Sequence, residues 1–172
     1  MKLDFNNTTH RIVLAGLLAA CILLLTIVVA VPIPNMAGAY VNLGDTGVYL
    51  AAFLLGGPWG ALCAAVGSAL ADILLGSVLY AGPTFVIKGL MALIAGTLLK
   101  KWSGGKRALA LLCAGIIMPL GYFLFETCLY GAAAALAGLP ANCIQYAVGV
   151  VLGLSVVAIA DKMCANAVCG KR

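Results

Sequence analysis

Apolar residues occur along this chain in long runs that short polar or Pro/Gly-rich segments separate. The first run, residues 12–31, has 20 residues and no charge, and it ends at Pro32 and Pro34. A membrane-spanning helix needs about 20 apolar residues, whereas the apolar region of a signal peptide has about 7–15. The length therefore predicts a retained transmembrane helix.

Five further helical segments follow, with a Pro/Gly/Asn-rich loop at 32–44, a loop at 76–83 and a basic turn at 100–107 between some of them. The predicted segments are 45–55, 59–75, 84–99, 108–130 with a kink at Pro119, and 140–159. The segment 45–55 is short for a full span, so we expect it to be tilted, broken or only partly spanning. The pattern predicts an all-α membrane protein with six transmembrane helices, in which residues 1–172 form a single integral membrane domain.

The basic residues indicate how this domain is oriented. Six crossings place both termini on one side of the membrane, together with the turn between the second and third segments and the turn between the fourth and fifth. Nine of the ten Lys and Arg residues then lie on this side. By the positive-inside rule this side is cytoplasmic. We expect a multi-pass protein of the cell membrane with both termini inside, a cytoplasmic leader at 1–11 and a cytoplasmic tail at 161–172.

The composition agrees with a membrane protein and excludes other classes. Hydrophobic types make up 65% of the chain and charged types 9%, against about half and about a quarter in soluble domains. The formal charge of +5 comes from helix ends and one loop, which does not predict nucleic-acid binding. The seven cysteines show no C-x-x-C pair, so we predict no metal site; a disulfide between Cys128 and Cys143 stays open.

Polar residues from separate segments converge at one level, near the outer ends of the predicted helices. Charge inside a membrane is costly and by default marks function. A ring of donors, acceptors and tyrosines suits a pocket for a small polar aromatic ligand, with the loop 32–44 as its lid. The predicted substrate-binding residues are Asn42, Asp45, Asp72, Tyr80, Thr84, Lys88, Glu126, Tyr130, Asn142 and Gln145.

Structural roles for the same residues remain open alternatives. Lys88 would then pair with Asp72 or Glu126 inside the bundle, and such a pair is weak evidence for stability. Asp45 and Asn142 would cap the starts of their helices. In the ligand-binding interpretation, Lys88 neutralises charge on the ligand, and Tyr80 or Tyr130 stacks on its ring.

Several motifs for catalysis are absent, and small residues indicate a different use of the first helix. Gly104-Gly105-Lys106-Arg107 is too short for a P-loop, the only histidine is His10, and Asn42-Leu43-Gly44-Asp45 lacks the first glycine of a G-x-G-D protease motif. We therefore predict neither enzyme activity nor a cofactor. Ala15 and Ala19, four residues apart, allow another helix to approach closely, either within the bundle or from a partner protein.

Several blocks resemble the substrate-binding S components of energy-coupling-factor (ECF) vitamin transporters. The resemblance covers about residues 11–160, and the Thr-Phe-x-Ile-Lys-Gly and Asn-Leu-Gly-Asp blocks resemble the branch assigned to pyridoxine, hydroxymethylpyrimidine or riboflavin. The blocks are Tyr40-Val-Asn-Leu-Gly-Asp45, Leu54-Leu-Gly-Gly-Pro58, Gly67-Ser-Ala-Leu-Ala-Asp72, Pro83-Thr-Phe-Val-Ile-Lys-Gly89, Glu126-Thr-Cys-Leu-Tyr-Gly131 and Pro140-Ala-Asn-Cys-Ile-Gln145.

The resemblance implies a function in ATP-driven import. The chain would bind a B vitamin or precursor near the outer face and reorient to release it inside. Its partners would be a transmembrane coupling protein, which Ala15 and Ala19 would face, and two cytoplasmic ATPases. Two other classes remain as alternatives: a small membrane enzyme, and a structural assembly protein whose polar ring is only an internal network.

Overall fold

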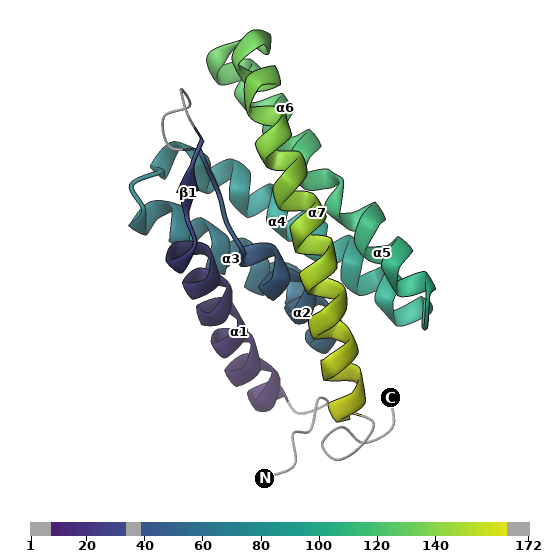
Figure 1. The fold of residues 1–172 in the computed structure, drawn as a ribbon. Coiled ribbons are helices and arrows are strands. Elements are labelled where there is room, and N and C mark those ends of the chain that lie inside the picture. The colour runs from purple at the N-terminus through teal and green to yellow at the C-terminus, as the bar shows by residue number, and fades with distance from the viewer. Residues whose placement is uncertain (1–7, 34–38, 165–172) are drawn as a thin grey trace.

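Helices run through nearly all of the described chain, residues 8–33 and 39–164 of a computed structural model (Figure 1). The helices are α1 (Thr8–Val28), α2 (Gly44–Leu55), α3 (Gly57–Leu74), α4 (Val78–Lys101), α5 (Lys106–Gly115), α6 (Ile117–Tyr130) and α7 (Ala132–Met163). Two short strands, β1 (Val31–Pro32) and β2 (Tyr40–Val41), pair antiparallel between α1 and α2. Parts of three predicted segments fall outside the described residues: 1–7 of the leader, 34–38 of the loop with Pro34, and 165–172 of the tail.

Among the described residues, five helical segments are long and apolar enough to span a membrane: α1, α3, α4, α5 with α6, and α7. The predicted all-α membrane fold is thus confirmed. The sixth segment, α2, has 12 residues and is about 18 Å long, against a hydrocarbon core of about 30 Å. It crosses only part of the bilayer, as its length predicts.

The short helix α2 forms the centre of the bundle. It packs against α1, α3, α4 and α7, and Val48, Tyr49 and Ala51 on it are fully buried. The Tyr49 hydroxyl donates a hydrogen bond to the Leu111 carbonyl on α5, at 3.1 Å. A helix too short to span is stable here because protein surrounds both of its ends.

The α3–α4 packing depends on backbone contact. A Cβ atom on Gly96 would lie 2.6 Å from the Gly57 amide nitrogen and 2.8 Å from the Gly56 carbonyl carbon. Only glycine permits the two helices to approach this closely. This contact fixes the position of α4, which carries several residues of the candidate site.

Two predicted helix starts are wrong. The fourth helix begins at Val78, not Thr84, and runs through Pro83. Tyr80, Thr84 and Lys88 form one buried stripe on it, and the packing of this stripe outweighs the backbone hydrogen bond that proline cannot donate. The last helix begins at Ala132, not Pro140, since an alanine-rich run of strong helix formers precedes the proline.

The predicted kink at Pro119 lies elsewhere. The chain breaks at Ile116, between α5 and α6, and Pro119 falls in the first turn of α6. The amide groups of a first turn have no partner within their own helix, so the proline costs little there.

The start of α1, the α4–α5 turn and the end of α7 lie at one end of the bundle (Figure 1). At this end Arg107 bonds to Asp161 at 2.9 Å, and the Arg11 guanidinium lies 5.6 Å from the Trp59 ring centroid. The described basic residues other than Lys88 gather here, and we call it the basic end. The even number of membrane crossings and the orientation of this end in the cell stay predictions.

Candidate functional site

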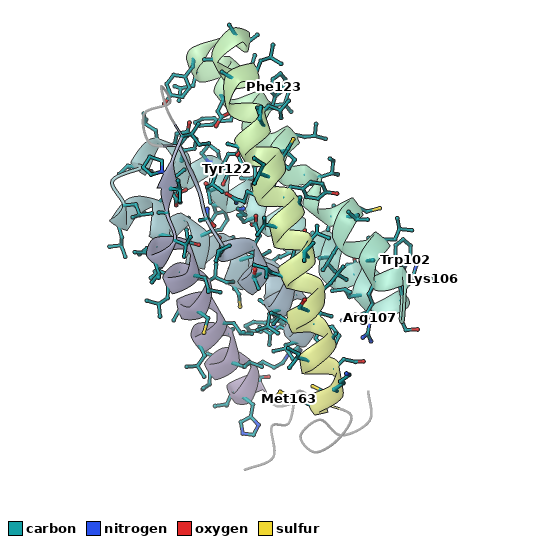
Figure 2. All side chains as sticks on the ribbon, in the orientation of Figure 1. Trp102, Lys106, Arg107, Tyr122, Phe123 and Met163 are labelled. Atoms are coloured by element: carbon teal, nitrogen blue, oxygen red, sulfur yellow. The ribbon has the colours of Figure 1, made fainter. Side chains whose placement is uncertain are left out.

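A pocket lies at the opposite end of the bundle from the basic end, beneath the β1–β2 hairpin. Figure 2 shows Tyr122, one of its lining residues, far from Lys106, Arg107 and Met163. Its empty volume is about 260 Å³, including solvent space at the mouth. The hairpin and four helices supply the lining: Ile33, Ala39, Tyr40, Asp72, Tyr80, Thr84, Tyr122, Glu126 and Asn142.

Three buried polar atoms of this lining have no hydrogen-bond partner among the described residues: Asp72 Oδ2, Glu126 Oε2 and Asn142 Nδ2. Their residues are only 3%, 1% and 4% exposed. Leaving a buried polar group unpaired costs about 1–3 kcal/mol, and more when it is charged. Two acceptors and one donor with unused hydrogen-bonding capacity therefore lie around one cavity.

The other oxygens of the two carboxylates are held by tyrosines. The Tyr40 hydroxyl donates to Asp72 Oδ1, and the Tyr80 hydroxyl donates to Glu126 Oε1 at 3.5 Å. Burial raises the pKa of the Tyr40 phenol above its ordinary value, and the bond to Asp72 acts in the same direction. Tyr40 therefore stays protonated and remains a donor, which orients the Asp72 carboxylate.

An apolar cluster covers the pocket. Ile33 and Ala39, on the arms of the hairpin, are buried with Tyr80, and the Ile33 amide donates to the Ala39 carbonyl at 2.9 Å. The Tyr80 ring meets Phe125 edge-on, with centroids 5.2 Å apart. The described arms of the loop 32–44 thus lie over the pocket, where the predicted lid belongs.

A second set of predicted residues forms a closed polar network that does not line the pocket. The Lys88 ammonium forms an ion pair with Asp45 Oδ1, and Gln145 Nε2 donates to Asp45 Oδ2 at 2.9 Å. Gln145 Oε1 accepts from the Asn42 amide at 2.9 Å. This network connects α2, α4 and α7 to the chain just after β2. It therefore holds the base of the hairpin.

The ten predicted substrate-binding residues thus divide into three groups. Five line the pocket: Asp72, Tyr80, Thr84, Glu126 and Asn142. Four form the network: Asn42, Asp45, Lys88 and Gln145. Tyr130 packs against the apolar cluster at the rim.

The structural alternatives have different outcomes. Lys88 pairs with Asp45, so the pairing with Asp72 or Glu126 is wrong. Asn142 lies inside α7, not at its start, so it does not cap the helix. Asp45 lies in the first turn of α2, but its carboxylate bonds to Lys88 and Gln145 instead of capping.

Sequence reasoning missed two tyrosines that line the pocket, Tyr40 and Tyr122. Tyr122 precedes Glu126 by four residues, so both lie on one helical face, and its hydroxyl bonds to Thr84 at 2.8 Å. That spacing was a usable signal. Tyr40 opens the Asn-Leu-Gly-Asp block and lies within the predicted lid.

Two small residues of α1, Ala15 and Ala19, contact α3 within the bundle. Cys63 Sγ on α3 donates to the Ala15 carbonyl at 3.3 Å, and a Cβ atom on Gly67 would lie 2.6 Å from the Ala19 oxygen. Ala15 and Ala19 are half-buried, whereas Gly16 and Ala20 are exposed. Their predicted role toward a coupling protein stays a prediction.

No cysteine is among the described residues that line the pocket. Cys128 and Cys143 are both exposed, and the structure shows them as free thiols. Among the described residues, no group of three or more His, Cys, Asp or Glu side chains is arranged to hold a metal ion.

Comparison with known proteins shows what this chain is similar to. The family model of the ECF-type riboflavin transporter S component matches residues 6–162. A thiamine precursor transporter, HmpT, of Lactococcus lactis subsp. cremoris (strain MG1363) is 32% identical over 152 residues, 88% of each chain. An uncharacterized protein of Pyrococcus woesei is 37% identical over 129 residues, which are 74% of this chain and 86% of that protein.

Two solved structures share the fold. The S component of a bacterial ECF transporter superposes with a TM-score of 0.71 at 22% identity, covering 92% of this chain and 98% of that one. The S component for biotin from an ECF-type ABC transporter has the same TM-score at 18% identity, with 94% of each chain covered.

Proposed function

Because this chain belongs to the S components of ECF transporters, we propose that its pocket beneath the β1–β2 hairpin captures a small vitamin precursor from outside the cell. S components are membrane transport subunits, not enzymes, and they pair with an ECF module. The unpaired Asp72, Glu126 and Asn142 atoms carry the proposal. A purely structural polar ring would pair these groups with one another, as the Asp45–Lys88 network does.

We propose a single-ring substrate, with the hydroxymethylpyrimidine precursor of thiamine as the first candidate. Even the space of about 260 Å³, which includes solvent at the mouth, is small, so a compact single-ring ligand suits the pocket better than a three-ring flavin. The similarity to a thiamine precursor transporter supports the same choice. An aminopyrimidine with a hydroxymethyl group offers two donors to the carboxylates and ring acceptors to Asn142.

A ligand-binding screen tests this proposal. We expect hydroxymethylpyrimidine to stabilise the purified protein in detergent strongly, pyridoxine less, and riboflavin least. A ligand at 100 times its dissociation constant adds about 2.7 kcal/mol of stability, which a thermal unfolding scan detects. Asn142→Leu should remove the ligand-induced shift, whereas the matched control Ser155→Ala, on an exposed face of the same helix, should keep it. No shift with any single-ring vitamin would contradict the proposal.

We propose that the basic end is cytoplasmic and that the pocket opens outward in the capturing state. The supporting observation is that the described basic residues other than Lys88 gather at the end opposite the pocket. The coupling protein and two ATPases of the predicted module would then act from the basic end. Their work would reorient the chain and present the pocket to the cytoplasm.

Cysteine labelling of intact cells tests this orientation. In a cysteine-free background, we expect Ala133→Cys, next to the α6–α7 turn, to react with a membrane-impermeant maleimide added outside. Ser103→Cys, in the α4–α5 turn, should react only after permeabilisation; both positions are exposed. Labelling of Ser103→Cys in sealed cells would reverse the assignment.

A further inference from the structure

We infer that the pocket selects its ligand by charge, binding a neutral or cationic heterocycle that carries hydrogen-bond donors and rejecting the phosphate ester of the same compound. The inference rests on the proposed function and adds to it a specificity that Asp72 and Glu126 determine. It follows from the charges around the cavity.

Negative groups outnumber positive ones around the pocket. Asp72 and Glu126 line it, and no lysine or arginine does. Lys88, the only buried basic residue among those described, is bound to Asp45. When all four groups are ionised, this buried region carries two uncompensated negative charges. The other described basic residues are at the basic end and cannot compensate them.

The unpaired atoms of the pocket also favour a ligand that donates hydrogen bonds. Two of the three are carboxylate oxygens, which accept hydrogen bonds, and only Asn142 Nδ2 donates. The tyrosine hydroxyls of Tyr40 and Tyr80 already donate to the other oxygens of these carboxylates. A ligand that pairs all three atoms must therefore supply two hydrogen-bond donors and one hydrogen-bond acceptor.

A phosphate ester is the wrong complement to this lining. It carries a charge of about −1.5 to −2 at pH 7 and presents acceptor oxygens. Sites that bind phosphate supply arginine, lysine or several free backbone amides, and the lining side chains supply one amide donor. Phosphorylating a ligand hydroxyl also removes an O–H group that would donate a hydrogen bond to a carboxylate. Charge repulsion and the lost donor act in the same direction.

Titration calorimetry on the full chain in lipid nanodiscs tests the inference. The probes are hydroxymethylpyrimidine with its phosphate ester, and pyridoxine with pyridoxine 5′-phosphate. We expect each ester to bind at least about 100-fold more weakly than its free alcohol, because like charges placed together in a site are strongly disfavoured. This comparison uses the native chain, so it does not depend on whether a variant folds.

Two variants then assign the selectivity to the carboxylates. Glu126→Gln and Asp72→Asn should each lower the ratio of the ester's dissociation constant to the alcohol's dissociation constant about 10-fold. Asp161→Asn, which removes a carboxylate at the basic end, should leave this ratio unchanged. Equal affinity of the native chain for both members of a pair overturns the inference while the proposed function stands. An unchanged ratio in both pocket variants also overturns it. If neither free alcohol binds, the proposed function itself fails, and the inference fails with it.

Discussion

Replacing Lys88 with methionine is expected to lower the free energy of unfolding by about 3–5 kcal/mol, one of the two largest effects that we predict for a single substitution. Lys88 and Asp45 are 2% and 1% exposed and bind each other. Removing one partner of a buried ion pair leaves the other charge uncompensated, which is the costly event. Methionine keeps most of the length of the side chain, since it lacks only the terminal ammonium group, so the loss reports mainly the charge and not a cavity.

Removing both charges should restore most of the stability. In Lys88→Met with Asp45→Asn, the asparagine oxygen still accepts from Gln145 Nε2, which bonds to Asp45 at 2.9 Å in the native chain. The double variant leaves no uncompensated buried charge, which is the main cost in either single variant. The measurement is equilibrium unfolding in mixed detergent micelles, with both single variants and the double variant forming a cycle.

The Arg107–Asp161 pair provides the matched control. Its members' side chains are 20% and 46% exposed, against 3% and 2% for Lys88 and Asp45. Pairs in contact with water contribute about 0–1 kcal/mol, so Asp161→Asn should change stability by no more than that. If Lys88→Met is equally mild, or if the double variant is worse than either single one, the ion pair is not the source of stability.

The same experiment separates the two roles of Lys88. The sequence interpretation places its ammonium on the ligand, whereas the structure places it in the network that holds the base of the hairpin. In a supporting role, the double variant should regain ligand affinity together with stability. In a ligand-contacting role, affinity should stay lost in the double variant even when stability returns.

Sequence reasoning found the level of the polar residues but not their partners. Apolar run lengths and the charge bias fix where each helix crosses, so Asp45, Asp72, Lys88 and Glu126 were expected at one depth. Which carboxylate binds Lys88 depends on how the helices rotate about their axes. That rotation is decided by contacts such as Gly96 with Gly57, between residues far apart in the chain. Composition carries no record of such contacts.

Helix boundaries near prolines also could not be predicted from the local sequence alone. Pro83 and Pro140 were expected to end or begin helices, yet both lie inside them. A proline costs one backbone hydrogen bond, and the burial of a side-chain stripe on the same helix outweighs it. The local rule is sound, but the packing that overrides it is a property of the folded bundle.

Gly96→Ala is expected to destabilise the protein by about 3 kcal/mol, at the upper end of the usual cost of overpacking a core. The added Cβ would lie 2.6 Å from Gly57 N and 2.8 Å from Gly57 Cα. These are backbone atoms, which cannot rotate away as a side chain does. Helices α3 and α4 must therefore separate where Gly96 meets Gly57, which loosens their packing near the basic end.

Gly89→Ala is the matched control, because Gly89 lies seven residues earlier, on the same face of α4. Its Cβ would come no closer than 3.4 Å to any atom, the nearest being the Ala65 Cβ, which is ordinary contact. Alanine is also the better helix former by about 1 kcal/mol, so this variant should be as stable as the native chain or slightly more so. Thermal unfolding of both variants in the same detergent decides the matter. Equal losses would show that any alanine on this face is harmful, and equal stability would show that α3 and α4 do not depend on backbone contact at Gly96.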